Sequence, residues 1–324
     1  MTAPAAPTGV EAGLAPPGRV RRRRLRDSQR RRESLAAWAF VAPSALGTGL
    51  FVFVPMMLAF ALSFTSANGF GQYPWVGLAN YERMFHDPLF TNSIKVTALF
   101  VLGFVPGVYL LGLVMALVVY GAIPARAFFR VAFFAPYTVS LVVVGLVWRY
   151  MLADRVGVVG SVLQQIGIDN PPAFLGNPDL ALWVVVVASI WFFVGYYMVI
   201  LLGGLQEIPQ DVLDAARLDG AGTWRMVVSI ILPMLKPTTF FALVLATIAG
   251  LAGLQSFDLI YVMTQGGPAN STSLGIYYVY EQAFKSSQFG YAAAMATWYA
   301  LVLMLFTGIA FKLTRGGRFD VGDR

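Results

Sequence analysis

Six long apolar stretches constrain this chain more than any other feature. They cover residues 37–64, 93–120, 129–152, 180–204, 237–263 and 290–312. Each is longer than the roughly 20 residues that a helix needs to cross the hydrocarbon core of a bilayer. Only 12% of the residues are charged while 58% are hydrophobic, so the chain cannot shield its apolar side chains from water by folding on itself. The sequence therefore predicts an all-α, polytopic integral membrane protein with six transmembrane helices.

The composition also argues against several chemical functions. The chain contains no cysteine and a single histidine, His86. Disulfides and thiolate chemistry are thereby excluded, and too few soft ligands remain for a transition-metal site. We expect no catalytic residue, no metal site and no enzymatic activity.

Positive charge is distributed unevenly along the chain. Nine arginines lie within residues 1–33, a Pro-, Gly- and Ala-rich stretch without apolar periodicity that we predict to be a disordered tail. Such a run is able to bind nucleic acid, but its position just before a span favours an orientation signal at the anionic cytoplasmic leaflet, with no nucleic-acid partner. If the amino terminus is cytoplasmic, eighteen of the 23 cationic residues fall on the inner side. Both termini are therefore predicted to be cytoplasmic.

The spans and polar segments divide the chain into four predicted parts. Residues 1–33 are the Arg-rich tail, and 34–92 hold the first span and an outer amphipathic segment in which Leu78, Tyr81, Met84 and Phe85 share a helical face. Residues 93–313 form the core, with a cytoplasmic loop over 205–236. Residues 314–324 are a second cytoplasmic tail.

A polar island over residues 207–237 interrupts the apolar pattern and carries its own start and stop signals. Pro209 favours the first turn of a helix, whereas Gly220 and Gly222 permit the left-handed backbone that ends one helix and begins another. Thr223 is a suitable N-cap for the second helix, and Pro233 imposes a boundary or a kink. We predict a helix, a tight turn and a second helix at a membrane face.

This island resembles the signature loop of bacterial ABC-importer permeases, which reads Glu-Ala-Ala, three residues, Gly, nine residues, Ile-x-Leu-Pro. The match here is Asp214-Ala215-Ala216, then Gly220, then Ile230-Ile231-Leu232-Pro233, with Asp in place of the leading Glu. The resemblance implies the type I ABC importer permease fold in a bacterial cell membrane. It also implies three protein partners: a second homologous permease, an ATP-binding cassette ATPase dimer and an extracytoplasmic solute-binding protein. The expected ATPase-coupling residues are Asp214, Ala215, Ala216, Gly220, Leu232 and Pro233.

The source of energy is expected to lie outside this chain. No Gly-x-x-x-x-Gly-Lys-[Ser/Thr] phosphate loop occurs, and the dipeptide Gly-Lys is absent. We therefore expect no cofactor here and ATP to be bound by the partner. The small side chains of Ala215 and Ala216 favour docking of this helix in an apolar groove, with Asp214 pairing with a cation.

Aromatic and polar residues within the fourth and fifth spans are the candidate substrate contacts. The ending Asp258-Leu-Ile-Tyr-Val-Met-Thr-x-Gly-Gly-Pro is similar to the carbohydrate-uptake branch of the family, of the maltose or glycerol-phosphate type. Helical spacing puts Ala249, Gly253 and Ser256 on one face of the fifth span. The resemblance and this spacing together nominate Phe193, Val194, Tyr197, Gly253, Gln255, Ser256 and Asp258. Simple packing between helices remains an alternative for any one of them.

Charge near these residues favours a neutral sugar or oligosaccharide. An anionic ligand would require Arg or Lys inside the bundle, and only Arg149 lies near, whereas Asp258 is negative. Glycerol phosphate and a polyamine remain as alternatives. A secondary carrier or an intramembrane enzyme is disfavoured, because the spans contain neither an ionisable relay nor an inverted repeat.

Overall fold

The computed structural model of the protein describes residues 37–121, 124–154 and 156–313. Both predicted tails, 1–33 and 314–324, therefore lie outside the described residues. These residues form helices, and the β-structure among them amounts to one isolated bridge between Thr65 and Trp75. They fall into two units, one ending at Leu58 and the other beginning at Ala59.

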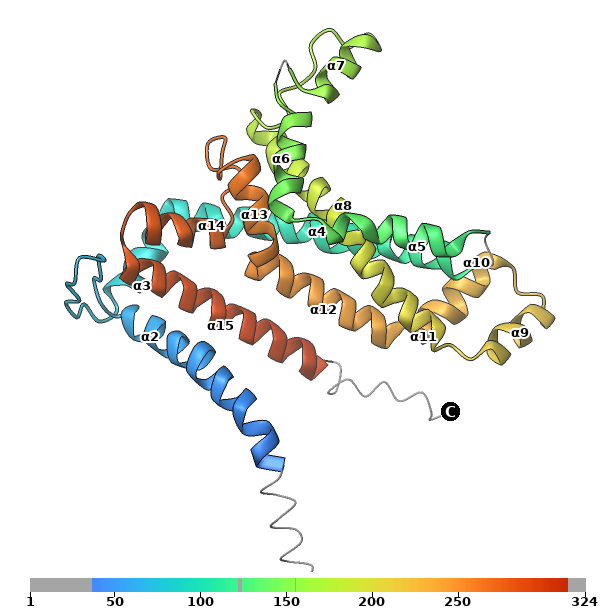
Figure 1. Cartoon of the computed structure of the whole chain (residues 1–324), viewed down its shortest axis with the longest axis horizontal. Coiled ribbons are helices and arrows are strands. Elements are labelled where there is room, and N and C mark those ends of the chain that lie inside the picture. The colour runs from blue at the N-terminus through green and yellow to red at the C-terminus, as the bar shows by residue number, and fades with distance from the viewer. Residues whose placement is uncertain (1–36, 122–123, 155, 314–324) are drawn as a thin grey trace, which may run out of the picture. The chain divides into compact units, whose positions relative to one another are not determined.

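The helices follow the predicted spans with several interruptions (Figure 1). A first apolar helix covers Ala37–Leu62 and contains the π-helical turn η1 (Gly49–Phe53) and α2 (Val54–Leu62). The others are α3 (Ala79–His86), α4 (Pro88–Tyr120), α5 (Arg126–Phe134), η2 (Ala135–Thr138), α6 (Leu141–Met151), α7 (Val158–Gln165), α8 (Pro178–Gln206), α9 (Gln210–Leu218), α10 (Thr223–Met226), η3 (Val227–Ile231), α11 (Leu232–Met234), α12 (Lys236–Ala252), α13 (Leu254–Met263), α14 (Gly275–Tyr280), η4 (Glu281–Lys285) and α15 (Phe289–Leu313).

Four of these helices are long and apolar enough to cross a membrane, namely Ala37–Leu62, Pro88–Tyr120, Pro178–Gln206 and Phe289–Lys312. Two bent pairs, Arg126–Thr138 with Leu141–Met151 and Thr223–Met234 with Lys236–Ala252, raise the number to six if each is one span. The bends are 92° and 72°. The prediction of an all-α polytopic membrane protein is confirmed.

The third and fifth predicted spans are not continuous helices. In the third, Pro136 has no N–H to extend the ladder of α5, and the extended residues Val139 and Ser140 lead into α6. In the fifth, Gly253 has φ +63° and separates α12 from α13. The expectation that Ala249, Gly253 and Ser256 share one helical face is therefore wrong.

Two of the π-helical turns precede a proline at the same spacing. η1 ends two residues before Pro55, and η3 ends two residues before Pro233. A proline ring clashes with the carbonyl group four residues earlier, which in both cases belongs to the middle of the π turn. A widened turn moves that carbonyl away, so the helices continue past their prolines.

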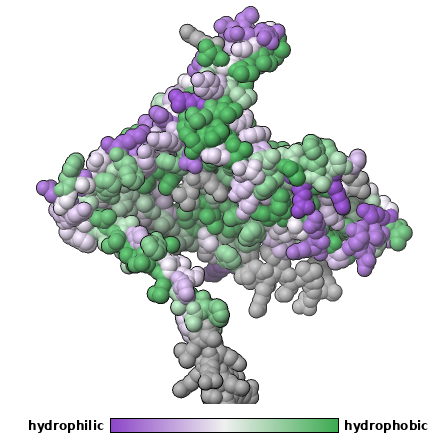
Figure 2. All heavy atoms as spheres, in the orientation of Figure 1, coloured by the Kyte–Doolittle hydropathy of each residue, from purple (hydrophilic) through white to green (hydrophobic). Residues whose placement is uncertain are grey.

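The core of the larger unit is built on α4 and α8, which pack against each other, with α12 packed against both. Gly103, Gly107 and Gly112 on α4 leave room for side chains of α8, including Trp183 and Ile190. The second halves of the broken spans, α6 and α13, also pack together. In Figure 2, hydrophobic residues cover much of the helical surface, while hydrophilic residues gather around α7 and α9.

The predicted amphipathic segment contains a helix, α3, whose side chains differ in burial. Met84 and Asn80 are buried, whereas Leu78 and Phe85 are exposed. The Asn80 side chain donates hydrogen bonds to the backbone oxygens of Ser63 and Thr65, both at 2.8 Å. This polar anchor, which hydropathy does not detect, fixes α3 to the backbone of residues 63–65.

Candidate functional site

The predicted docking helix is α9, which is anchored to its own chain along one side. Leu213 and Ala216 are 2% and 8% exposed and belong to the main hydrophobic core. Val212, Ala215 and Asp214 are exposed. Ala216, one of the predicted coupling residues, thus faces its own subunit, and the side of α9 left for a partner carries Val212, Asp214 and Ala215.

The carboxylate of Asp214 is held on this open side by two neighbours within the helix. Its Oδ1 accepts hydrogen bonds from Arg217 Nη1 at 2.7 Å and from Gln210 Nε2 at 3.3 Å. The Arg217 and Asp214 side chains are 62% and 55% exposed, so the ion pair contributes at most about 1 kcal/mol to stability. The carboxylate is therefore oriented but remains accessible.

Gly220 ends α9 in a complete Schellman motif. It has φ +77°, and its N–H donates to the Arg217 carbonyl at 3.1 Å while the Ala221 N–H donates to the Ala216 carbonyl at 3.0 Å. A Cβ at Gly220 would meet no atom within 4 Å. Backbone conformation, rather than space, thus requires glycine there.

The caps of this hairpin sit one residue away from their predicted places. Pro209 is the N-cap of α9 rather than its first helical residue, and Gly222 rather than Thr223 is the N-cap of α10. Pro233 lies in α11 directly after η3, where it is exposed, while Leu232 beside it is half-buried. The predicted helix–turn–helix is otherwise as expected.

The predicted substrate residues of the fourth span lie inside the subunit. Phe193, Val194 and Tyr197 on α8 are all buried. The Phe193 ring packs edge-on against Phe104 at 5.9 Å and against Tyr137 at 5.9 Å between centroids. In this conformation these side chains hold α8 against α4 and η2.

The predicted residues of the fifth span cluster around the break between α12 and α13. A Cβ on Gly253 would overlap the Ile276 side chain, so glycine is needed there for space as well as for its backbone. Ser256 is buried and Asp258 is half-buried on α13. The side chain of Gln255 lies outside the described residues. Arg149, the cation that the sequence places near the predicted substrate residues, donates to the Val262 carbonyl at 3.1 Å and joins α6 to α13.

An aromatic cluster next to Asp258 was missed in large part from the sequence. We define it as Phe257, Tyr261, Tyr277, Tyr280 and Phe284. Tyr280 sits in the middle, with ring centroids 5.1 Å from Phe257, 5.6 Å from Tyr261 and 5.3 Å from Phe284. Tyr261 and Phe284 are 41% and 67% exposed, so the cluster presents ring surface to the outside of the subunit. The helical spacing of 277, 280 and 284 was the available signal.

A lysine beside the aromatic cluster, Lys285, is hydrogen-bonded to two neighbouring side chains. Lys285 Nζ donates to the Tyr277 hydroxyl and to Glu281 Oε1, both at 2.9 Å. These two hydrogen bonds raise the pKa of Lys285 above its usual value. Its charge is balanced locally by Glu281, so the cluster offers no free cation to an anionic ligand.

Comparison with known proteins decides the family. The sequence profile of the binding-protein-dependent transport system inner membrane component matches residues 108–316. The chain belongs to this family. It is a transport permease subunit rather than an enzyme, and the prediction of an ABC-importer permease is confirmed.

Individual relatives of this permease cover most of its length. It is 33% identical to the diacetylchitobiose uptake system permease protein NgcF of Streptomyces coelicolor over 83% of this chain and 80% of that one. It is 32% identical to the sn-glycerol-3-phosphate transport system permease protein UgpA of Agrobacterium fabrum, over 85% and 93% of the two chains. A solved bacterial ABC transporter for import of the acidic polysaccharide alginate has the same fold, with a TM-score of 0.77 at 22% identity over 90% of this chain and 98% of that one.

At the other end of the permease, Asp87 ties four helices together. It caps α4 by accepting from the Leu89 N–H at 2.8 Å, and its Oδ2 accepts from the hydroxyls of Tyr278 on α14 at 2.6 Å and Tyr291 on α15 at 2.7 Å. The Arg83 guanidinium of α3 lies 4.2 Å from the centre of the Tyr291 ring. Partial burial acts to raise the pKa of Asp87, but these hydrogen bonds outweigh it, and the pKa lies below its usual value.

Replacing Asp87 with alanine is expected to lower the melting temperature of the detergent-solubilised permease by about 4–8 °C. The two tyrosine hydrogen bonds to this charged group contribute about 1.5–3 kcal/mol each, and each kcal/mol shifts Tm by about 1.5 °C for a chain of 324 residues. Because the folded pKa is depressed, this stabilisation is complete above the unfolded pKa of about 4 and disappears as the pH falls through the folded value. Thermal unfolding at pH 7 and at successively lower pH measures both effects.

The control for this prediction is a mutant cycle. Adding Tyr278→Phe and Tyr291→Phe to the Asp87→Ala protein is expected to cost little more, because the hydroxyls have then lost their common acceptor. Full additivity of the three changes would contradict a shared network.

Proposed function

We propose that this permease is one of two transmembrane subunits of an ATP-driven importer, in which it forms, with a second homologous permease, the path for a neutral sugar or oligosaccharide. An extracytoplasmic binding protein delivers the solute, and an ATP-binding cassette ATPase dimer grips α9 from the cytoplasm. The protein lies in the bacterial cell membrane with both termini inside. The observation that carries the proposal is the open side of α9, with Asp214 oriented at its centre.

The geometry of α9 supports a docking role. A short amphipathic helix with one side anchored and the other exposed suits the helix-in-groove mode of recognition. Ala215 permits close approach of the partner, and Asp214 supplies a charge for a cation on it. Because Leu213 and Ala216 belong to the main hydrophobic core, we expect a displacement of α9 to be passed on to that core.

The orientation rests on charge. Five cations lie in the segments predicted to be cytoplasmic, namely Arg126, Arg130, Arg217, Arg225 and Lys236. An excess of Lys and Arg next to span ends favours the cytoplasmic side. An ATPase contact at α9 requires the same orientation.

The sugar substrate is supported by the aromatic cluster and by relatives. NgcF is named for diacetylchitobiose uptake, and a third relative, AmyD of Thermoanaerobacterium thermosulfurigenes, is named for probable transport of starch degradation products, at 28% identity. The C–H faces of a sugar stack on exposed rings such as Tyr261 and Phe284, while Asp258 accepts hydrogen bonds from hydroxyls. Asp258 and Glu281 disfavour an anionic ligand.

Glycerol phosphate is the second candidate, because UgpA is 32% identical. It differs from a sugar in requiring a cation at the binding site, and Lys285 is already paired with Glu281. A polyamine would instead use Asp258. The three candidate solutes, a sugar, glycerol phosphate and a polyamine, are distinguished by an uptake experiment. The proteoliposomes contain both permeases, the ATPase and the binding protein. We expect ATP-dependent accumulation of a neutral saccharide. Saturable uptake of glycerol phosphate or a polyamine with no saccharide transported would overturn the assignment.

Replacing Tyr280 with alanine is expected to raise the KM of saccharide uptake about tenfold while leaving kcat nearly unchanged. Tyr280 packs against the exposed rings of Tyr261 and Phe284, and the loss of such ring contacts costs about 1.4 kcal/mol, which corresponds to a factor of ten. Tyr280→Phe keeps the ring and is expected to behave almost like the wild type. The matched control is Tyr150→Ala, which removes a tyrosine that is exposed on α6, outside the cluster. Equal effects of the two alanine variants would contradict a role for the cluster.

A further inference from the structure

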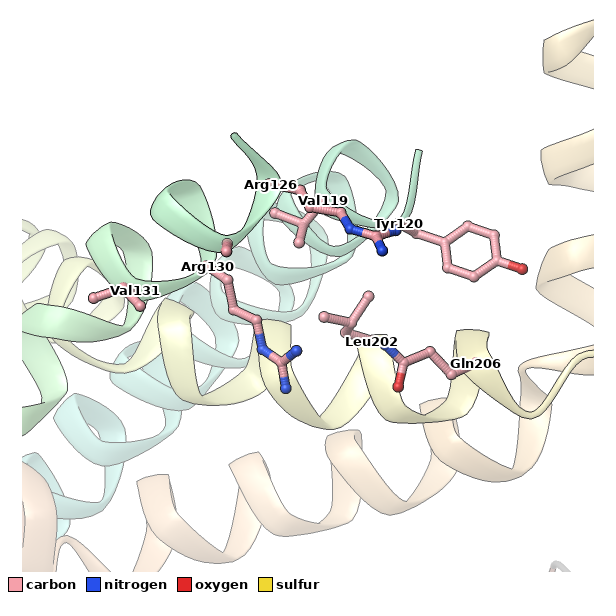
Figure 3. A pocket seen from close by; sticks show the side chains of 8 residues that line it. Val119, Tyr120, Arg126, Arg130, Val131, Leu202 and Gln206 are labelled. Atoms are coloured by element: carbon pink, nitrogen blue, oxygen red, sulfur yellow. The ribbon is translucent and has the colours of Figure 1, made fainter. Parts of the chain in front are cut away.

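A cationic cavity lies between α4, α5 and α8, away from both α9 and the aromatic cluster. Its volume is about 470 Å³, and it is lined by Val119, Tyr120, Arg126, Ala127, Arg130, Val131, Leu202 and Gln206. Figure 3 shows Arg130 reaching from α5 towards α8, from which Leu202 and Gln206 project into the same space. The volume falls in the range of about 300–1,000 Å³ that is typical of small-molecule sites.

Two arginines give this cavity an unbalanced positive charge. Arg126 and Arg130 stand four residues apart, so their side chains rise from the same face of α5. Over residues 37–121, 124–154 and 156–313, neither guanidinium group has an acidic partner. The amino-terminal end of α5 adds the partial positive charge of its helix dipole. The cavity is therefore suited to an anion with several oxygens, of which a phosphate is the best match for two guanidinium groups.

Apart from Tyr120 and Gln206, the rest of the cavity lining and its surroundings is apolar. Val119 and Leu202 form a buried apolar floor, while Val131 at the rim is 68% exposed. Phe128, on the same short helix, is equally exposed at 68%. In a membrane protein, exposed apolar side chains beside arginines mark the boundary between head groups and acyl chains. The ligand that fits both halves of the cavity is an amphiphile with a phosphate head.

We propose that this cavity binds one anionic phospholipid, with Arg126 and Arg130 on its phosphate oxygens, Gln206 and Tyr120 on its glycerol or head-group hydroxyls, and an acyl chain along Val131 and Leu202. The site goes beyond the transport function, because it does not depend on which solute is carried. Gln206 is the last residue of α8, four residues before α9 begins, so the lipid holds the helix end from which the docking helix extends.

Two other occupants are less compatible with the surface. A carboxylate on the ATPase would satisfy the arginines, but it would leave Phe128 and Val131 facing a polar protein surface or water. A free phosphate or nucleotide would leave the apolar floor uncovered. Both are distinguished from a lipid by the experiment.

The test is lipid retention by the full importer complex, purified in mild detergent after reconstitution with phosphatidylglycerol and phosphatidylcholine and analysed by native mass spectrometry. We expect the wild type to retain one phosphatidylglycerol per permease in preference to phosphatidylcholine. Each cation near an anionic lipid contributes about fivefold in affinity, so Arg126→Gln with Arg130→Gln is expected to reduce retention about 25-fold. The matched control, Arg225→Gln with Lys236→Gln, removes two cations that do not line the cavity and is expected to retain the lipid.

A second measurement on the unmodified chain covers the case in which the double variant fails to fold. Phosphatidylglycerol with a photoreactive acyl chain is expected to crosslink to peptides that contain Val131 or Leu202. Retention that is equal in both double variants, or crosslinks confined to other helices, would overturn the proposal. Displacement of the lipid by millimolar inorganic phosphate would assign the cavity to a soluble anion, and loss of the ATPase with retention of the lipid would assign it to a protein contact.

Discussion

Replacing Gly220 with valine and Asp214 with leucine in the same chain is expected to reduce ATP-driven uptake about a hundredfold, while the protein still inserts in the membrane. A factor of a hundred corresponds to about 2.7 kcal/mol of lost coupling. Valine at Gly220 must adopt φ +77°, which costs a side chain with a Cβ about 1–2 kcal/mol and opens the end of α9. Leucine at position 214 removes the charge from the open side of the helix. Uptake into proteoliposomes, recovery of the permease in the membrane fraction and co-purification of the ATPase measure the three consequences separately.

The control uses the neighbouring residues of the same hairpin. Arg217→Gln removes the ion-pair partner of Asp214 but leaves its carboxylate, and Gly222→Ala changes a glycine with an ordinary φ of −67°. This second double variant is expected to keep most of its uptake and its ATPase. If the control variant loses uptake and its ATPase as fully as the first double variant, α9 does not act as the docking helix. Normal transport by the first double variant would lead to the same conclusion.

The second large effect is expected from Gly195→Ala, which should destabilise the permease by about 3 kcal/mol or more. A Cβ at Gly195 would overlap the carbonyl group of Phe133 and crowd the Cα of Phe134. These are backbone atoms of α5, which cannot rotate away as a side chain does, so α5 must separate from α8. Overpacking of this kind costs about 1–3 kcal/mol when side chains can adjust, and more when they cannot. We expect a fall in Tm of at least about 4 °C in thermal unfolding of the solubilised protein.

Gly203→Ala is the matched control, because it makes the same chemical change on the same helix. A Cβ at Gly203 would meet no atom within 4 Å. The higher helix propensity of alanine is then expected to increase the free energy of unfolding by up to about 1 kcal/mol. Tm should therefore stay unchanged or rise slightly. A similar loss in both variants would mean that the approach of α8 to α5 is not the cause.

Hydropathy predicted the positions of the straight spans well, but it underestimated the length of one of them, α4. The predicted stretches 180–204 and 290–312 correspond to Pro178–Gln206 and Phe289–Lys312. The stretch that begins at 93 in the prediction begins at Pro88 in α4, because Asp87 caps the helix and Pro88 occupies its first turn. The polar residues that follow hide this first turn from a hydropathy window, although the cap and the proline were visible in the sequence.

The breaks in the third and fifth spans were beyond the same reasoning. The predicted span continued past Gly253, because an isolated glycine does not by itself show whether its backbone is left-handed or helical. The contact that requires glycine there is made by Ile276, a residue 23 positions later in the chain. The aromatic cluster was missed for a similar reason, since α13 and α14 meet only after the break has turned the chain.

The candidate docking site was predicted more accurately than the substrate residues. The spacing of its motif located α9 and the left-handed Gly220, because both depend on local backbone chemistry. The spacing alone did not assign Leu213 and Ala216 to the interior, which is set by contacts with the core. Phe193, Val194 and Tyr197 are a harder case, because aromatic residues in a span pack and bind with the same side chains.

The glycines of α4 also restrict how the subunit is able to move. Trp183 meets Gly103, Ile190 meets Gly107 and Tyr197 meets Gly112, in the same order along both helices. If one helix slid past the other by a turn, Tyr197 and either Trp183 or Ile190, depending on the direction, would be driven against a residue with a Cβ. The α4–α8 pair therefore resists sliding, and we expect these two helices to move together as one rigid unit rather than by shear between them.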